Sequence, residues 1–284
     1  MTFDAAIIAN YDDMSGSYTC NRLCLEAEKR GIRMETVGVL DTVITDDGII
    51  NRGKVIGGYD FVINRYKWGH VKDAIAGSSQ RSYNRIDVFN IYVNKYEQYR
   101  RIRSGLFDKP RSILSNGSVE FSAIADDLGT PFVAKGLENS QGSEIFLIDC
   151  KDDYDKIIAE YGSGKEWLFQ EFISASRGRD LRVFSVRGRP IVSMIRENEN
   201  DFRSNFALGS TLTLFDNDDV IEGITEEIYR QTGIDFVGID LLFGKEGYCL
   251  CEVNVMPGLK GVESVSGVNV AGTIMETIRG DLDG

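Results

Sequence analysis

Two apolar segments near the C-terminus, 236–243 and 248–254, carry polar side chains where a buried strand normally carries none. Both are rich in Val, Ile, Leu, Phe and Tyr, and a glycine-bounded loop joins them, a composition typical of a β-hairpin within a buried sheet. Inside the two segments lie Asp240, Glu252 and Asn254. Because a buried carboxylate costs several kcal/mol unless a cation or a donor meets it, these side chains need partners.

Strand geometry predicts where the polar groups point. Side chains alternate between the two faces of a strand, so Glu252 and Asn254 are expected to share one face. The opposite, apolar face is expected to carry Cys249, Cys251 and Val253. With the carboxylate of the neighbouring strand alongside, three oxygen-bearing side chains converge, and such ligands suit Mg²⁺ bridging substrate phosphates. This pattern predicts a nucleotide–metal site, with local hydrogen bonding of the three groups as the alternative.

Size and charge exclude several classes of protein. At 284 residues the chain exceeds the usual size of one domain, so two or three domains are expected. The formal net charge of −12 argues against a nucleic-acid partner, which requires clustered Lys and Arg. The five cysteines lack metal-site spacing and suit a reduced, cytoplasmic protein, and no apolar stretch approaches membrane-spanning length. The single histidine, His70, has no nucleophile motif beside it, which disfavours a Ser-His-Asp or Cys-His mechanism.

The N-terminal region predicts an α/β domain. Apolar segments of strand length occur at 3–9, 32–40 and 59–63. Between the first two, helical spacing predicts a helix from Tyr18 to Arg30 that packs on the sheet. Loop 12–17 has one glycine and no G-x-G-x-x-G, so a dinucleotide site there has little support. The segment Asn64-Arg-Tyr-Lys67 follows a strand and places two cations beside an aromatic ring. It either binds a carboxylate-bearing substrate or is a solvated loop.

The rest of the chain alternates strands and helices, with a domain boundary expected near the basic segment 93–103. Lys135 ends an apolar strand before the polar loop 136–143, so its ammonium and free backbone N–H groups could bind phosphate, although such loops mostly just turn the chain. One residue separates Arg203 from Asn205, so their side chains are expected on the same side of the segment 201–206. This segment is either a charge clamp at a reacting centre or a surface bend. Further helices are expected at 119–128, 152–160, 221–231 and 268–278, and further strands at 144–148, 167–173, 183–186 and 190–195.

Six motifs, in this order, make the chain resemble the ATP-grasp ligases, and most closely their RimK-like branch of α-L-glutamate ligases. They are Lys135, Gln170-Glu-Phe-Ile173, Gly178-Arg-Asp-Leu-Arg182, Asp201-Phe-Arg-Ser-Asn205, Gly238-Ile-Asp-Leu-Leu242 and Glu252-Val-Asn-Val-Met-Pro-Gly258. The resemblance covers nearly the whole chain. It implies an α/β (α+β) protein with the ATP-grasp fold, in which two α+β subdomains clasp ATP. The implied domains are a Rossmann-like N-terminal domain at 1–93, a central subdomain with a lid at 94–173 and a C-terminal subdomain with the metal site at 174–284.

The resemblance also implies roles for individual residues. ATP is the expected cosubstrate, with Mg²⁺ expected as a pair of ions and Mn²⁺ as a substitute. For the nucleotide, the resemblance implies that Lys95 and Lys135 contact the phosphates, that Gln170, Glu171 and Phe172 contact the adenine, and that Asp180 contacts the ribose. It implies Arg203 and Asn205 as the catalytic residues, in contact with the transferred phosphoryl group. The implied metal ligands are Asp240, Glu252 and Asn254.

The implied reaction joins a carboxylate to an amine. The carboxylate attacks the γ-phosphoryl group to give an acyl phosphate and ADP, and the amine then forms an amide and releases phosphate. The expected partners are an amino acid or small acid, and an amine, peptide or protein C-terminus; modification or cyclisation of a ribosomally made peptide is an alternative. A small-molecule kinase and a non-catalytic nucleotide-binding module are alternatives of other classes. The sequence leaves open whether the protein forms a homo-oligomer.

Two departures from the family pattern bear on the substrate. After Asn205 the modifiers of ribosomal proteins continue with a His-Arg-Gly-Gly-type run, whereas Phe206-Ala-Leu-Gly-Ser210 lacks both cations. The lid segment 139–144 is also poorer in glycine than theirs. Loss of an arginine near the reacting end weakens the expectation of an anionic amino acid such as glutamate.

Overall fold

The computed structural model describes the chain except residues 1, 12–15, 138–143 and 206–208. The N-terminal region forms a parallel sheet, as the β-α-β pattern predicts, with strands in the order β2-β1-β6-β7. Ser17 caps the first helix by accepting a hydrogen bond from the Cys20 N–H at 3.3 Å. The elements are β1 (Phe3–Ala9), α1 (Tyr18–Glu28), β2 (Ile32–Gly38), β6 (Phe61–Asn64), α2 (His70–Gly77) and β7 (Ser82–Tyr83).

A small antiparallel sheet, in the order β3-β4-β5, is inserted between β2 and β6. A turn between Thr45 and Gly48 joins its first two strands, and the segment to Ile56 adds a third. The elements are the 3-10 helix η1 (Val39–Asp41), β3 (Thr42–Thr45), β4 (Gly48–Asn51) and β5 (Lys54–Ile56).

The basic segment 93–103 contains one helix, which is separate from the helix before it. Helix α3 (Ile86–Tyr92) ends before it, and α4 (Lys95–Arg101) begins afresh at Asn94. The Asn94 side chain accepts hydrogen bonds from the backbone N–H groups of Tyr96 and Glu97. Asn at this N-cap position satisfies donors that a continuous helix would bond internally, so the chain changes direction here.

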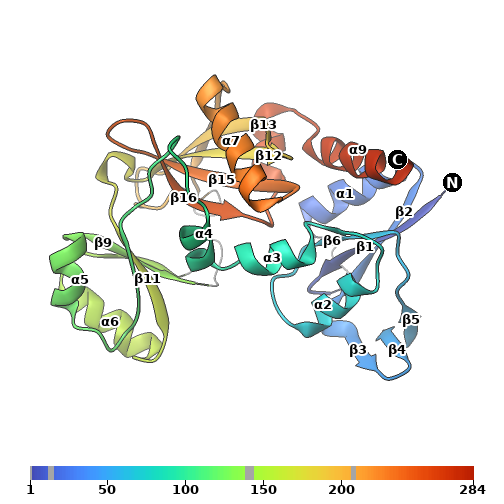
Figure 1. Cartoon of the computed structure of the whole chain (residues 1–284), viewed down its shortest axis with the longest axis horizontal. Helices are drawn as coiled ribbons and strands as arrows, with labels where there is room; N and C mark the ends of the chain where they lie inside the picture. The colour runs from blue at the N-terminus through green and yellow to red at the C-terminus, as the bar shows by residue number, and fades with distance from the viewer. Residues whose placement is uncertain (1, 12–15, 138–143, 206–208) are drawn as a thin grey trace.

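The central region is an antiparallel sheet in the order β10-β9-β11-β8. Helices α5 and α6 cover this sheet at one end of the molecule, and the N-terminal sheet lies at the other (Figure 1). The elements are β8 (Ser112–Asn116), α5 (Phe121–Leu128), β9 (Phe132–Gly136), β10 (Ile145–Ile148), α6 (Lys151–Tyr161) and β11 (Glu166–Glu171).

A second antiparallel sheet, in the order β14-β13-β12-β15-β16, ends in the predicted hairpin. Its third strand in that order, β12, is longer than the predicted 183–186 and begins at Arg179, so Asp180 and Arg182 belong to the sheet. Strand β14 and helix α8 were not predicted. The elements are η2 (Ser174–Ser176), β12 (Arg179–Val186), β13 (Arg189–Glu197), β14 (Thr211–Phe215), α7 (Asp219–Thr232), β15 (Phe236–Phe243), β16 (Tyr248–Asn254), α8 (Lys260–Ser266) and α9 (Val270–Asp283).

The N-terminal sheet and the C-terminal sheet share one hydrophobic core. Ile7 and Leu23 belong to the same buried cluster as Phe184 and Ile274, and Figure 1 shows α1 beside α9. The fully buried Asn84 reinforces the junction, because its side chain hydrogen bonds to Phe236 N at 3.0 Å and to Val255 O at 2.9 Å. The central region has a separate core formed within residues 113–169. The domain ranges given above stay predictions.

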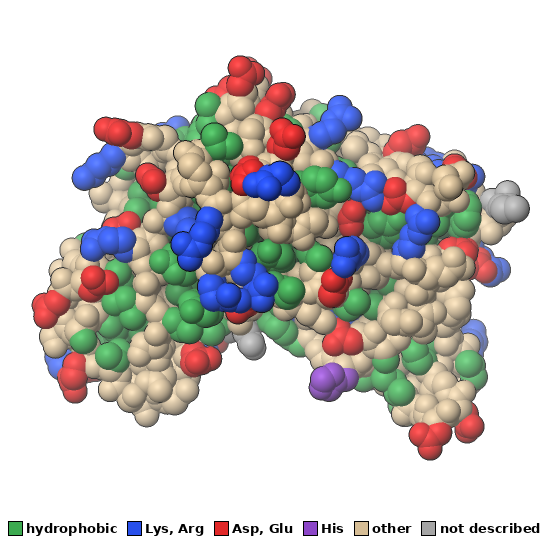
Figure 2. Space-filling view, viewed as in Figure 1, with side chains coloured by type: hydrophobic (Ala, Val, Ile, Leu, Met, Phe, Trp, Pro, Cys, Tyr) green, Lys and Arg blue, Asp and Glu red, His purple; other side chains and the backbone are tan. Residues whose placement is uncertain are grey.

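The surface carries charges of both signs. Figure 2 shows acidic and basic side chains interspersed over one face, which is hollowed between the central and N-terminal ends of the molecule. Among the described residues, none of the helices combines the length and the apolar character needed to cross a bilayer. His70 is exposed at the start of α2.

Candidate functional site

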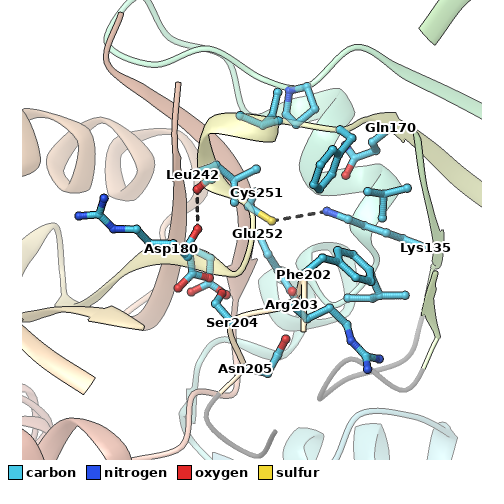
Figure 3. Close-up of a pocket in the computed structure, with 18 of the residues that line it drawn as sticks. Lys135, Gln170, Asp180, Phe202, Arg203, Ser204, Asn205, Leu242, Cys251 and Glu252 are labelled. Carbon is cyan, nitrogen blue, oxygen red and sulfur yellow. Dashed lines mark hydrogen bonds between the residues drawn. The ribbon is translucent and has the colours of Figure 1, made fainter. Parts of the chain in front are cut away.

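A cleft with a volume of about 720 Å³, including space open to solvent, lies between the two antiparallel sheets. Figure 3 shows side chains from both sheets directed into it. Of the predicted site residues, all except Lys95 and Asn254 line this cleft, as far as the chain is described. Those that do are Lys135, Gln170, Glu171, Phe172, Asp180, Arg203, Asn205, Asp240 and Glu252. Lys95 lines a smaller adjoining pocket together with Lys135 and Glu252.

The end of β11 and the residues directly after it form one end of the cleft. Gln170 is buried and donates its Nε2–H to Ser112 Oγ at 2.8 Å, while its Oε1 has no partner among the described residues. The Glu171 N–H donates to the Arg111 carbonyl at 2.9 Å, and the Arg111 N–H donates to the Glu171 carboxylate at 3.0 Å. The ring of Phe172 packs edge-on against Phe202 at 6.3 Å between centroids. Phe172 supplies an apolar ring and Gln170 Oε1 a polar atom in the cleft lining, and a flat heterocycle can use both.

Three lysines and one carboxylate form the basic side of the site. Lys135, buried near the end of β9, donates to Cys251 Sγ at 3.5 Å (Figure 3). The Lys95 ammonium lies 4.0 Å from Glu252 Oε1. Burial and the neighbouring Lys95 ammonium lower the pKa of Lys67 to about 8, against the opposing charge of Glu252. The Asn64-Arg-Tyr-Lys67 segment therefore lies beside the site, and Lys67 is not simply a solvated surface residue.

The predicted metal ligand Asp240 is held by two arginines. Its carboxylate accepts two hydrogen bonds from Arg182, one of them at 2.7 Å, and lies 3.0 Å from Arg196 Nη2. Burial acts to raise the pKa of Asp240, but the two guanidinium groups outweigh it and hold the pKa below its usual value. Gly238 makes room for this pairing, since a Cβ there would lie 2.7 Å from Arg182 Nη1. The cations that a buried carboxylate requires are thus present within the protein.

The donor set remains suitable for a divalent cation. Asp240 and Glu252 are opposite one another across β15 and β16, and both line the cleft. Asn254 lies at the end of β16, where its Oδ1 accepts from the Met256 N–H at 2.9 Å. Carboxylate and amide oxygens are ligands that Mg²⁺ accepts, although a cation at Asp240 would compete with Arg182. No group of three or more His, Cys, Asp or Glu side chains forms a metal cluster within the described part of the chain.

The predicted apolar face of β16 is wrong for two of its three residues, because Cys249 pairs with Leu242, which lines the cleft, and Cys251 lines the cleft itself. Between Asp240–Glu252 and Leu241–Leu250 the register shifts, so Cys251 is an extra residue without a partner on β15. Such a β-bulge breaks the strict alternation of faces. Cys251 therefore lines the cleft next to Glu252, and Leu250 and Val253 supply the buried apolar side instead.

Two other predicted residues are engaged within the protein. Both oxygens of Asp180 accept hydrogen bonds from Arg196, at 2.7 Å for the Nε–H, so a ribose contact would have to share this carboxylate. Arg203 pairs with Asp201 at 2.7 Å on the side of the cleft opposite Gln170 (Figure 3). Asn205 lies beside it, and the lid residues 138–143 lie outside the described residues. The assigned roles of Asp180, Arg203 and Asn205 stay predictions.

Comparisons with known proteins identify the fold and the family. Residues 94–278 match the model of the RimK-like ATP-grasp domain. A probable alpha-L-glutamate ligase of Xanthomonas oryzae pv. oryzae is 31% identical over 278 residues, which cover 92% of this chain and 93% of that protein. A similar ligase of Citrobacter koseri is 28% identical and is covered to 92%. The chain belongs to the RimK-like ATP-grasp family.

Solved structures of ATP-grasp proteins have the same fold at lower sequence identity. The RimK domain protein from Sphaerobacter thermophilus superposes with a TM-score of 0.72 at 18% identity, over 95% of this chain and 98% of that one. The ATP-grasp ligase PsnB in complex with a minimal precursor, Mg and ADP gives a TM-score of 0.68 at 16% identity, over 97% and 96%. The D-alanine–D-alanine ligase of Bacillus anthracis in complex with ATP gives 0.71 at 13% identity, over 97% and 96%. The predicted fold class is confirmed.

Sequence reasoning missed the arginines of this RimK-like site. Arg182 and Arg196 come from β12 and β13, and they meet Asp240 only because β12 pairs with both β13 and β15. A signal was present, since Arg182 stands two residues after Asp180 on the same face of a strand. The partner of that face depends on strand pairing, which spacing within one segment does not reveal.

Proposed function

We propose that this protein is an ATP-dependent carboxylate–amine ligase that forms an amide bond and releases ADP and phosphate. The observation that carries the proposal is the cleft between the two sheets, in which three groups converge: a lysine, an amide oxygen that has no partner among the described residues, and a cross-strand pair of carboxylates. Family membership supports a ligase, because the curated relatives are named as probable alpha-L-glutamate ligases.

The cleft residues suit binding and charge neutralisation. The buried Gln170 Oε1 and the backbone after it would accept and donate to an adenine edge, and Lys135 would neutralise phosphate charge. Asp240, Glu252 and Asn254 would hold Mg²⁺, which supplies further charge neutralisation when bound. Phosphoryl transfer depends mostly on positioning and charge, so the site needs no protein nucleophile.

The proposed reaction has two steps. An oxygen of the substrate carboxylate bonds to the γ-phosphorus of ATP as the bond to ADP breaks, giving an acyl phosphate. The amine nitrogen then bonds to the acyl carbon, phosphate leaves with the former bridging oxygen, and the nitrogen loses a proton. We infer an amino acid as one substrate and a peptide, protein C-terminus or small metabolite as the other, with the cytoplasm as the site of action.

A ribosomally made peptide is the second candidate acceptor. PsnB was solved with a precursor peptide, and a ligase of Chryseobacterium gregarium was solved with ADP and a leader and core peptide. These chains share the fold with this protein over 97% and 98% of its length, which supports a peptide as a candidate acceptor.

An isotope experiment tests the mechanism. The protein is incubated with Mg-ATP, standard amino acids labelled with oxygen-18 in the carboxylate, and amine or peptide acceptors, and phosphate and products are analysed by mass spectrometry. A ligase transfers one labelled oxygen to phosphate and yields an amide, whereas Glu252→Gln, the matched control, yields neither. Formation of AMP and pyrophosphate contradicts the proposal. A stable phosphorylated product that forms without an amine indicates a kinase.

A further inference from the structure

Strand β16, which carries the proposed metal ligands Glu252 and Asn254, is the last strand of its sheet, and other parts of the chain cover its outer edge. Asp108 pairs with the first half of this edge through a single bridge. Further along, the N–H of the buried Val253 donates to the side-chain oxygen of Gln98 at 2.8 Å. A buried backbone donor without a partner costs about as much as a lost hydrogen bond. Gln98 therefore takes the place of a neighbouring strand at the residue between the two proposed ligands.

Both ends of the Gln98 amide are used. The side chain is buried, and its Nε2–H donates to the carbonyl of Tyr92, the last residue of α3, at 2.6 Å. One side chain thus joins the end of α3 and strand β16 to helix α4. Glutamine suits this position because its amide offers a donor and an acceptor together.

Helix α4 carries Lys95 one turn before Gln98. Residues three apart lie on the same face of a helix, so both side chains face β16, and the Lys95 ammonium lies 4.0 Å from Glu252 Oε1. Both residues line the pocket that adjoins the ligase cleft, together with Lys135. The backbone N–H of Lys95 donates to Leu137 O at 3.1 Å, directly after β9. Helix α4 is therefore attached to both sheets that bound the cleft (Figure 1).

We propose that Gln98 is a positioning residue that fixes Lys95 beside the strand with the metal ligands. The inference rests on the proposed ligase function, in which Lys95 contacts the nucleotide phosphates. Without the Gln98 amide, the Val253 N–H loses its acceptor and α4 loses its side-chain link to β16. The Lys95 ammonium is then held less closely, and its attraction for phosphate falls as the distance grows.

A double-mutant cycle on nucleotide binding tests this role. The full chain is titrated by calorimetry with a non-hydrolysable ATP analogue in the presence of Mg, as the unaltered protein, as Gln98→Met, as Lys95→Met and as the double variant. Methionine keeps the length of the glutamine side chain and removes both hydrogen bonds. Circular dichroism confirms that each variant is folded. If Gln98→Met fails to fold, Gln98→Asn replaces it in the cycle, because this amide is one methylene too short to keep both bonds.

Gln231→Met is the matched control. The Gln231 amide also makes one donated and one accepted hydrogen bond with the backbone, both to Arg103. Gln231 lines neither the cleft nor the adjoining pocket. A loss of affinity that follows from general loosening of the fold should therefore appear in this variant as well.

We expect Gln98→Met to weaken binding of the analogue by about tenfold, the range of one hydrogen bond to a charged group. In the Lys95→Met background the same change should alter the affinity by no more than about twofold, because the residue through which Gln98 acts is gone. Gln231→Met should bind within about twofold of the unaltered protein.

Three results would overturn the inference: unchanged affinity in Gln98→Met, the same loss in both Lys95 backgrounds, or an equal loss in Gln231→Met. In each of these the unaltered protein still binds the analogue, and the proposed ligase function stands. Absence of binding by the unaltered protein would instead contradict the nucleotide site itself, and the proposed function with it.

Discussion

Replacing Asp240 by Asn should destabilise the protein as well as inactivate it. The change keeps the shape of the side chain but removes the negative charge that Arg182 and Arg196 share. Arg196 keeps its second partner, Asp180, whereas Arg182 loses the carboxylate that both of its donors reach. The Arg182 and Asp240 side chains are 12% and 6% exposed, so water replaces little of this interaction.

The expected loss follows from that burial. Breaking a buried ion pair by removing one partner costs about 3–5 kcal/mol, because a charge is left buried without compensation. The conversion is about 2–4 °C per kcal/mol for 150–250 residues, and a chain of 284 residues lies at its lower end, so the midpoint of thermal unfolding should fall by roughly 6–10 °C. Glu252→Gln is the matched control, since Glu252 is 25% exposed and 4.0 Å from its lysine. Lys95 is buried, but the pair is at the 4.0 Å limit of an ion pair and Glu252 keeps contact with water, so this variant should lose less stability than Asp240→Asn.

Differential scanning calorimetry of the three proteins without nucleotide, followed by activity assays, decides the matter. Both variants should lack ligase activity, but only Asp240→Asn should unfold early. If the two variants unfold at the same temperature, the arginine network does not contribute what its geometry implies. If Asp240→Asn retains full turnover, the metal assignment fails as well.

Three further predictions concern nucleotide binding, the backbone and pH. Lys135→Ala should weaken binding of an ATP analogue by about 10- to 100-fold in calorimetry, because it removes one charged hydrogen bond, and unchanged affinity would remove Lys135 from the phosphate site. Gly178→Ala should cost about 1–3 kcal/mol in urea unfolding, because φ is +66° and a Cβ would lie 2.8 Å from Asp201 O; Gly164→Ala, which meets no atom within 4 Å, should cost less, and equal losses would refute the steric reasoning. The hydrogen bond from Lys29 lowers the pKa of Glu26 from 4.5 to about 2 despite its burial, so the stability this carboxylate adds is present above pH 4.5 and is lost as pH falls towards 2. Urea unfolding at several pH values should therefore show the gap between the unaltered protein and Glu26→Gln closing on acidification, and a gap independent of pH would contradict the shift.

The sequence predicted the parts of this molecule that local pattern determines. The hairpin segments 236–243 and 248–254 coincide with β15 and β16, because composition and turn residues define them. Among the cleft residues, Asp240 and Glu252 follow from this local pattern, whereas Gln170, Glu171, Phe172 and Asp180 were expected only from the resemblance to the ATP-grasp ligases. The remaining features of the site depend on how the strands pair. The register shift between β15 and β16 places Cys251 in the cleft, and the alternation of residues within β16 does not predict it.

The long-range partners were equally hidden. Arg182 and Asp240 are 58 positions apart in the chain, and the break at Asn94 between α3 and α4 follows from one side chain competing with the helix backbone. Helical spacing through 93–103 is compatible with either arrangement. The contact of α4 with β16 is a further feature that the spacing does not show.

The shared core described above has a mechanical consequence for the reaction cycle. With Asn84 bonded to Phe236 and Val255, the N-terminal sheet and the sheet that contains β12 to β16 form one stationary body. The central sheet has an interior of its own, and the segments 102–111 and 172–178 join it to that body. A rotation of β8 to β11 as a unit would therefore leave the shared core intact.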